Sequence, residues 1–339
     1  MNFRSDNTAP CAAEILAAIA AVNDKPAAPY GEDPWSRKLD DAFGALFERE
    51  VRVFVVATGT AANSISLSSV TPPWGAIYCH REAHIERDEA GAPEFYAGGA
   101  KLVLVDGANA KLEASALEQA VRLGKRDEHA VKPAAVSISQ ATERGVVYRP
   151  QETTAIGRVA RENGLGFHMD GARFANAVAA LGCHPAEASW RGGVDLLSFG
   201  ATKNGALAAE AIVCFDLDRA EEIARRRKRG GHLISKGRYA AAQLLAYLEN
   251  DLWLRLAKRA NHLAQELAEA ARPILSAPVE TNQVFVKPGP AGLQKLRAAG
   301  ADFYEWGDEG SGEARLVVSW SQSEADIASM RRVLASLAR

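Results

Sequence analysis

Cysteine is scarce in this sequence, with four residues in 339. The four are far apart, form no Cys-x-x-Cys pair and have no histidine at metal-ligand spacing, which excludes a disulfide framework and a cysteine-based zinc centre. We expect all four to be reduced. Cys79 and Cys214 lie inside apolar runs and are predicted to fill the core; the others are Cys11 and Cys183.

An excess of charge of one sign is also missing. The 40 basic and 42 acidic residues leave a net charge of -2, so no overall field would attract nucleic acid or an anionic membrane. No apolar stretch is long enough to span a bilayer, and the first residues carry no apolar signal core. We therefore expect a cytoplasmic protein that binds a small molecule, with no nucleic-acid or membrane partner.

Two nucleotide-binding motifs are absent as well. The chain has neither Gly-x-Gly-x-x-Gly nor a Walker A loop, which argues against dinucleotide and nucleoside triphosphate chemistry. What the chain does have is a regular alternation of short β-rich runs with Ala-rich helical stretches such as 114–123 and 153–163. This alternation predicts an α/β fold, a mainly parallel sheet with helices on both faces. The predicted strands are 51–57, 76–79, 102–105, 134–138, 166–169, 196–199 and 211–215.

The C-terminal third follows a different pattern. A long helical region, 238–272, is predicted to leave the large domain, and short strands near 284–286, 301–306 and 315–320 follow with helices between and after them. We place the boundary near residue 246, which gives a large domain of residues 1–245 and a smaller α+β domain of residues 246–339. Ser321 and Glu324 stand in capping-box register and predict where the last helix begins.

An amine and a carboxylate are predicted at one edge of the large sheet. Lys203 follows the strand 196–199, and Asp170 follows the strand 166–169. Each alone is more often an ordinary loop residue. Together they suit pyridoxal 5′-phosphate (PLP), because a lysine forms a Schiff base with the cofactor aldehyde and an aspartate keeps the ring nitrogen protonated.

A phosphate site is predicted after the first strand. Thr58, Gly59 and Thr60 open a helix, whose free N–H groups and dipole favour an anion. The alternative is that Thr58 is simply the N-cap of an ordinary strand-to-helix turn.

A histidine and two arginines are further candidates for cofactor or substrate binding. His84 could lie on the cofactor ring, whereas the nearby His80 is expected on the surface. Arg173 and Arg315 suit a substrate carboxylate, since guanidinium groups bind carboxylates in a bidentate manner. Surface ion pairs are the alternative for both.

Taken together, these motifs resemble the PLP-dependent L-threonine aldolases of the β-eliminating lyase group, which have the fold type I (aspartate-aminotransferase-like) architecture. The resemblance implies a three-layer α/β/α large domain and a smaller α+β domain. It also implies a homotetramer with sites at dimer interfaces, Lys203 bound to PLP, Asp170 at the ring nitrogen and His84 on the ring. It would assign the phosphate to Gly59 and Thr60, the substrate carboxylate to Ser5, Arg173 and Arg315, and contact with a neighbouring site to the Tyr30 loop. The matching segments are 4–8, 30–34, 58–63, 83–84, 170–173 and 202–205.

The chain departs from the family pattern in two places. Glu143 stands where many members carry a histidine that approaches the substrate hydroxyl. After Gly230-Gly231, where a partner's arginine commonly reaches the phosphate, the chain offers His232, Lys236 and Arg238, and Lys236 is our candidate.

The resemblance implies retro-aldol cleavage of L-threonine, L-allo-threonine and related β-hydroxy-α-amino acids, including phenylserine, to glycine and an aldehyde. His84 is the candidate base for the hydroxyl proton, with Asp88 and Glu143 as rivals. The alternatives are a β-eliminating lyase or aminotransferase on the same fold, and a protein that only binds an amino-acid-like ligand.

Overall fold

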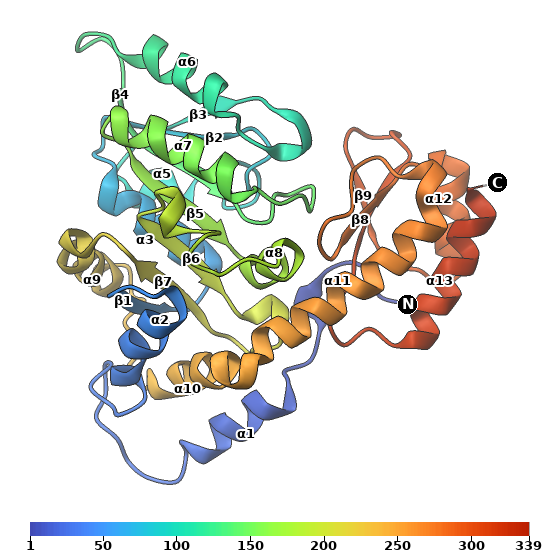
Figure 1. Cartoon of the computed structure of the whole chain (residues 1–339), viewed down its shortest axis with the longest axis horizontal. Coiled ribbons are helices and arrows are strands. Elements are labelled where there is room, and N and C mark those ends of the chain that lie inside the picture. The colour runs from blue at the N-terminus through green and yellow to red at the C-terminus, as the bar shows by residue number, and fades with distance from the viewer. Residues whose placement is uncertain (339) are drawn as a thin grey trace.

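The computed structural model describes residues 1–338 and centres on a seven-stranded sheet in the order β1-β7-β6-β5-β4-β2-β3 (Figure 1). Neighbours from β3 to β6 pair in parallel, whereas β7 is antiparallel to both β6 and β1. Only β7 is therefore reversed, and it begins at the edge where the other strands end. The strands are β1 (Arg52–Val56), β2 (Gly75–His80), β3 (Lys101–Val105), β4 (Lys132–Ser139), β5 (Gly166–Gly171), β6 (Leu196–Gly200) and β7 (Glu210–Cys214).

Helices cover both faces of this sheet, so the predicted α/β fold is confirmed. Alternate strand residues pack against α2, α6, α7, α8 and α10 on one face and against α3 and α9 on the other. Cys79 and Cys214 are fully buried on the α3 side, as predicted. The helices are α1 (Ala13–Ala21), α2 (Leu39–Phe47), α3 (Gly59–Val70), α4 (His84–Arg87), α5 (Ala92–Tyr96), α6 (Ala114–Gly124), α7 (Pro150–Glu162), α8 (Phe174–Leu181), α9 (Ala220–Arg229) and α10 (Arg238–Leu248).

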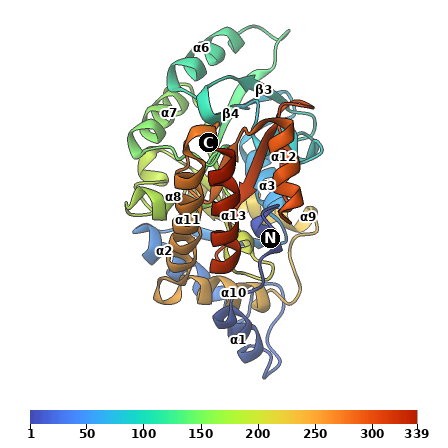
Figure 2. The same cartoon turned by 90° about the vertical axis from the view of Figure 1, so that its right-hand side faces the viewer.

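A second hydrophobic cluster lies in the C-terminal part of the chain (Figures 1 and 2). Its three-stranded sheet has the order β8-β10-β9, and α11 packs against α13 beside it. α11 joins the two clusters, since Trp253 belongs to the first and Leu263 to the second, and the N-terminal Phe3 also packs into the second. The elements are α11 (Leu252–Ala271), β8 (Gln283–Val286), α12 (Gly289–Ala298), β9 (Tyr304–Trp306), β10 (Glu313–Val317) and α13 (Glu324–Leu337).

Two details differ from the sequence-based predictions. The helical region 238–272 is broken, because Asn250 and Asp251 take left-handed conformations (φ 51° and 55°) between α10 and α11. The predicted capping box of Ser321 and Glu324 is wrong. The N-cap of α13 is Ser323, whose Oγ accepts a hydrogen bond from the Asp326 N–H at 3.1 Å.

Within residues 1–338, no helix combines the length and the apolar character that a membrane crossing requires.

Candidate active site

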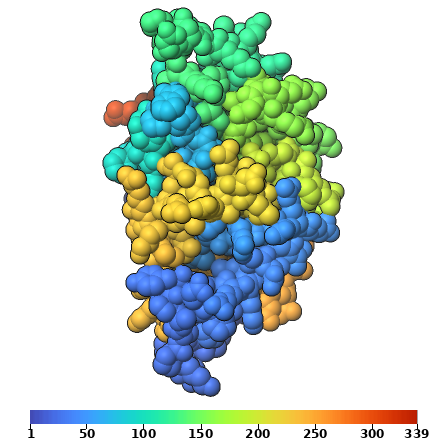
Figure 3. Space-filling model, turned by 90° about the vertical axis from the view of Figure 1, so that its left-hand side faces the viewer, coloured from blue at the N-terminus to red at the C-terminus, as the bar shows by residue number. Residues whose placement is uncertain are grey.

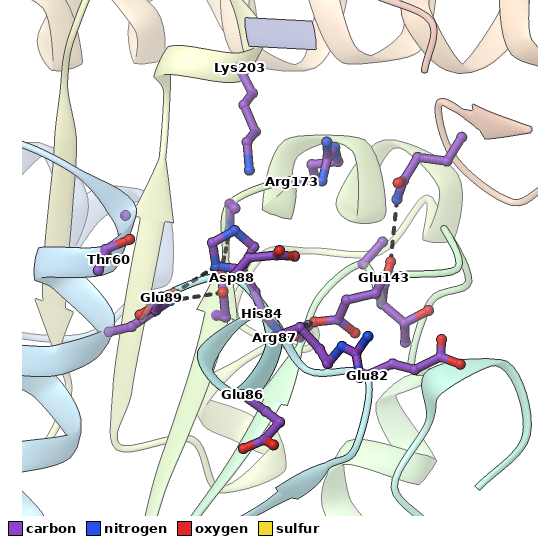
Figure 4. A pocket seen from close by; sticks show the side chains of 18 of the residues that line it. Thr60, Glu82, His84, Glu86, Arg87, Asp88, Glu89, Glu143, Arg173 and Lys203 are labelled. Atoms are coloured by element: carbon purple, nitrogen blue, oxygen red, sulfur yellow. Dashed lines mark hydrogen bonds and ion pairs between the residues drawn. The ribbon is translucent and has the colours of Figure 1, made fainter. Parts of the chain in front are cut away.

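A cavity of about 900 Å³ lies at the carboxyl ends of the strands and extends to the smaller sheet. In Figure 4, Lys203 extends into it toward His84, with Thr60 and Glu143 on opposite sides. Ten of the residues singled out in the sequence line this cavity: Thr58, Gly59, Thr60, His84, Asp88, Glu143, Asp170, Arg173, Lys203 and Arg315.

Three singled-out residues, Ser5, Tyr30 and Lys236, do not line it. The Ser5 hydroxyl caps a short 3-10 turn by accepting from the Asn7 N–H at 3.2 Å. Tyr30 is exposed, and its N–H donates to the carbonyl of Ser235 at 2.9 Å, which brings it beside Lys236. Figure 3 shows a face of the molecule on which N-terminal segments adjoin the segment around α9.

Lys203 is positioned by the turn that follows β6. It belongs to a 3-10 turn, Thr202–Asn204, and Asn204 anchors this turn by donating to the Tyr247 hydroxyl at 2.6 Å. Burial, with the positive charge of Arg173, lowers the pKa of the Lys203 amine. A lowered pKa increases the neutral fraction of the amine, which is the form that attacks an aldehyde.

Asp170 lies near the end of β5 and accepts two hydrogen bonds. The Ala172 N–H donates to Oδ1 at 3.0 Å, and Asn63 Nδ2 donates to Oδ2 at 2.9 Å. Burial acts to raise the pKa of Asp170, but His84, Lys203 and the Ala172 N–H act against it, and the pKa lies below its ordinary value. Asp170 is therefore a buried anion, which is what a protonated ring nitrogen needs beside it.

His84 has a buried carboxylate partner that the sequence did not reveal. Its Nδ1 lies 2.7 Å from Glu89 Oε1, which also accepts from Asn63 Nδ2 at 2.7 Å. This hydrogen bond raises the pKa of His84. Since Asn63 also binds Asp170, one hydrogen-bonded chain runs from the imidazole to the aspartate.

Glu143 faces the cavity from the loop after β4. Its Oε1 accepts from the Ser139 hydroxyl at 2.5 Å and from the His84 N–H at 3.0 Å. Burial raises the pKa of Glu143 to about 7, so the group can gain or lose a proton near neutral pH.

The two arginines have different environments. Arg173 is engaged by buried Asp6 in a bidentate ion pair, with Nε–Oδ2 at 2.7 Å and Nη2–Oδ1 at 2.9 Å. Arg315 lies over the Trp306 ring at 4.6 Å, and its buried Nε has no hydrogen-bond partner within residues 1–338. Burial lowers the pKa of Arg315 to about 10, which leaves it charged at neutral pH. Of the pair, Arg315 has more unused hydrogen-bonding capacity for a carboxylate.

The first turn of α3 opens into the cavity. Thr58 is its N-cap, and the Thr58 hydroxyl oxygen accepts a hydrogen bond from the Ala61 N–H at 3.1 Å. The alternative interpretation, that Thr58 caps the helix, is therefore correct for this side chain. The free N–H groups of the turn and the positive end of the helix dipole still favour an anion here. Glu210, another residue that the sequence did not reveal, also lines this part of the cavity.

The prediction that His80 lies on the surface is wrong. Only 6% of the residue is exposed, its Nε2 lies 3.0 Å from the carbonyl oxygen of Gly107, and its Nδ1 accepts from the Glu82 N–H. The ring shapes the turn that leads into α4, and satisfied polar contacts allow its burial.

The fold and this set of residues are those of the fold type I PLP-dependent class of proteins. In keeping with that class, an aspartate aminotransferase of Thermus thermophilus has the same fold, with a TM-score of 0.71 at 17% identity over 99% of this chain and 90% of its own. The model of the β-eliminating lyase family matches residues 2–289, and the chain belongs to that family.

Two relatives lie nearer in sequence or structure. The low specificity L-threonine aldolase of Pseudomonas aeruginosa is 43% identical over 335 residues, which cover 98% of this chain and 95% of the relative. The structure of a threonine aldolase from Leishmania major aligns with a TM-score of 0.93 at 29% identity, over 100% of this chain and 99% of the other. The resemblance to threonine aldolases is thus confirmed.

The residues present fit the cofactor that the family implies. An amine of lowered pKa, a carboxylate held ionised in a buried position and an open helix N-terminus all line one cavity. These groups match the aldehyde, the ring nitrogen and the phosphate of PLP, respectively.

Proposed function

We propose that the protein is a PLP-dependent aldolase that cleaves L-threonine, L-allo-threonine and related β-hydroxy-α-amino acids, phenylserine among them, to glycine and an aldehyde. The observation that carries the proposal is the convergence of Lys203, Asp170 and His84 on one cavity that also contains Arg315, whose Nε has no hydrogen-bond partner among residues 1–338. The 43% identity to a protein named low specificity L-threonine aldolase supports the choice of substrate.

In this proposal the cofactor is held at three points. Lys203 Nζ would hold it through its aldehyde carbon, Asp170 would pair with its ring nitrogen, and the first turn of α3, with Gly59 and Thr60, would hold its phosphate. His84, whose Nδ1 lies 2.7 Å from Glu89 Oε1, would lie against the ring. When bound, PLP supplies an electron-poor ring that takes up the electron pair left at the substrate Cα.

The substrate is oriented by its carboxylate. Arg315 binds the carboxylate with its unused N–H groups, and Arg173, fixed by Asp6, contributes the donors that Asp6 leaves free. Ser5 belongs to the same N-terminal turn as Asp6 and is the weaker third candidate. Fixing the carboxylate sets the orientation of the Cα–Cβ bond relative to the cofactor ring. That orientation determines which bond at Cα breaks.

A base must accept the proton of the β-hydroxyl group, and we assign this role to His84. The imidazole can accept a proton only when neutral, so turnover through His84 falls as the pH drops below its raised pKa. Asp88 and Glu143 are the rival carboxylates in the cavity. If His84→Asn retained full turnover with PLP bound, the assignment would pass to one of them.

Neighbouring subunits complete the site in this proposal. Tyr30 and Lys236 lie side by side on an exposed surface away from their own cavity, which is what residues that serve an adjacent subunit would do. We infer a homotetramer, built as a dimer of dimers, in which Lys236 reaches the phosphate in a partner's site. The near-neutral charge supports a protein without nucleic-acid partners, and we propose a cytoplasmic location.

The division into domains is likewise a proposal. The two hydrophobic clusters support a boundary near residue 246, with α11 spanning both. Phe3 packs with the second cluster, so the first residues would belong to the smaller domain rather than to the 1–245 domain.

Product analysis tests the activity. The PLP-loaded protein is incubated with L-threonine and, in parallel, with L-phenylserine, and glycine and aldehyde are quantified. Equal amounts of the two products support the aldolase, and a Lys203→Ala protein should form neither. Keto acid, with or without ammonia, would instead identify a β-eliminating lyase or an aminotransferase that uses the same lysine and aspartate.

A further inference from the structure

Glu210 occupies a special place in the sheet because β7 is the one reversed strand. It is the first residue of β7, and its register partners are Val56 in β1 and Gly200 in β6. β1 leads directly into the Thr58–Thr60 turn, and β6 leads into the turn that carries Lys203. Glu210 therefore stands between the predicted phosphate site and the lysine.

The side chain of Glu210 is directed toward both turns. Its Oε1 accepts from the Thr202 N–H at 3.3 Å, and its Oε2 lies 3.9 Å from the position that a Cβ on Gly59 would take. Glu210 shares a sheet face with Ile212, the face that packs against α3, and only 8% of the residue is exposed. A carboxyl group thus sits beside the helix end at which the phosphate would bind.

The charges around Glu210 do not cancel the effect of burial on its pKa. Lys203 lies on one side, Asp170 is a second anion of the same cavity, and the buried Tyr247 hydroxyl feels the charge of Glu210. Burial is the dominant influence and raises the pKa of Glu210 to about 7. The group can therefore be protonated at neutral pH at little free-energy cost.

We infer that Glu210 binds the cofactor phosphate as a neutral carboxylic acid and donates its proton to a phosphate oxygen. An ionised Glu210 would repel the phosphate dianion, whereas the protonated group gives it a short, charge-assisted hydrogen bond. The inference rests on the proposed function, since it takes the phosphate site at the start of α3 from there.

Proton uptake on binding is the consequence. The bound phosphate favours the protonated form and so raises the pKa of Glu210 above 7. Between the free and bound pKa values, binding takes up one proton, and the affinity falls by up to about tenfold per pH unit as the pH rises. Glu210→Gln removes the titrating group and keeps a hydrogen-bond donor.

Pyridoxine 5′-phosphate is a suitable probe, because it keeps the phosphate but lacks the aldehyde that reacts with Lys203. Its dissociation constant is measured on the full-length apoprotein from pH 6.5 to 9 by calorimetry, for the wild type and for Glu210→Gln. Pyridoxine, which has no phosphate, is the matched ligand. Glu143→Gln is the matched variant, because it removes the other cavity carboxyl group whose pKa is about 7.

We expect the wild-type affinity for pyridoxine 5′-phosphate to fall at least about tenfold relative to Glu210→Gln between pH 7 and 9. Glu143→Gln should keep the steeper fall with pyridoxine 5′-phosphate than with pyridoxine, and pyridoxine should show no difference between wild type and Glu210→Gln. Parallel curves for wild type and Glu210→Gln, or an equal difference with pyridoxine, would overturn the inference.

A measurement on the wild type alone guards against a variant that fails to fold. Binding enthalpies at pH 8 in buffers of different ionisation enthalpy give the number of protons exchanged. Net uptake with pyridoxine 5′-phosphate and none with pyridoxine supports the inference, and no uptake contradicts it. Because no step requires turnover, a protein that shows this linkage but does not cleave threonine would refute the proposed function alone.

Discussion

Among single residues, Glu89 links the imidazole of His84 to the carboxylate of Asp170. It binds His84 on one side and, through Asn63, Asp170 on the other. Its own side chain is fully buried, and Oε2 has no partner within residues 1–338. A buried carboxylate with an unused oxygen is costly, which argues that its place beside the imidazole has a functional reason.

Glu89→Gln should therefore alter the pH dependence of catalysis. Without the anionic partner the pKa of His84 falls toward its ordinary value, and the low-pH limb of the kcat profile moves to lower pH. We also expect kcat at neutral pH to fall about tenfold, because the imidazole loses its orientation. Glu86→Gln changes an exposed carboxylate that lines the same cavity and is the control. A profile that moves equally in both variants would contradict this role of Glu89.

The sequence predicted the residues of the site that belong to short local motifs. Lys203 and Asp170 each follow an apolar strand, and that position alone brought them to the same edge. Asp6, Glu89 and Glu210 were missed because their significance comes from contacts distant in sequence. Asp6, for example, lies 167 positions from Arg173, and no local pattern encodes that pair.

At the scale of elements, the N-terminus of α3 has two threonines, Thr58 and Thr60, to which the proposal gives different roles. Thr58 caps the helix through its hydroxyl oxygen. In the proposal, Thr60 contacts only the phosphate. Substituting each threonine should therefore distinguish the structural role from the binding role.

Thr58→Ala should lower the free energy of unfolding of the apoprotein by about 1 kcal/mol, the usual effect of losing an N-cap. Thr60→Ala should leave it unchanged and weaken PLP binding instead. Urea unfolding of the two apoproteins and titration with PLP provide both readouts. Equal loss of stability in the two variants would contradict the division of roles.

The seven large-sheet strands were predicted to within two residues at either end, because strands in the interior of a sheet covered by helices on both faces are nearly continuous apolar runs. The break between α10 and α11 was missed, since the helical periodicity continues on both sides of it. Asn and Asp tolerate left-handed conformations, so the pair Asn250-Asp251 was the feature of the sequence that could have indicated the break. The cap of α13 was misassigned because Ser321 and Ser323 both precede Glu324 and only the fold selects one.

At the scale of the whole molecule, the proposal makes each site depend on two subunits. Lys203→Ala removes the covalent anchor of one site, and Lys236→Ala removes the phosphate contact that this subunit gives to its partner. A mixed dimer would then contain one site in which both lysines are present.

Mixing the two variants after mild dissociation should thus restore activity. Random pairing gives hybrids as half of the dimers, each with one intact site, or about a quarter of wild-type activity. The assay is run at a PLP concentration at which Lys236→Ala alone is mostly free of cofactor. If Lys236 acted within its own subunit, the mixture would be no more active than the average of the two variants.

The fate of hydrogen at the substrate Cα tests the central claim, that this cavity breaks the Cα–Cβ bond, most directly. L-threonine and PLP-loaded protein are incubated in D₂O and followed by NMR from the first minutes. We predict glycine that carries one deuterium and retains the original α-hydrogen, with acetaldehyde in equal amount and no deuterium in the remaining threonine. Threonine deuterated at Cα, or 2-oxobutanoate in place of glycine, would show that the Cα–H bond is broken instead and would contradict the account.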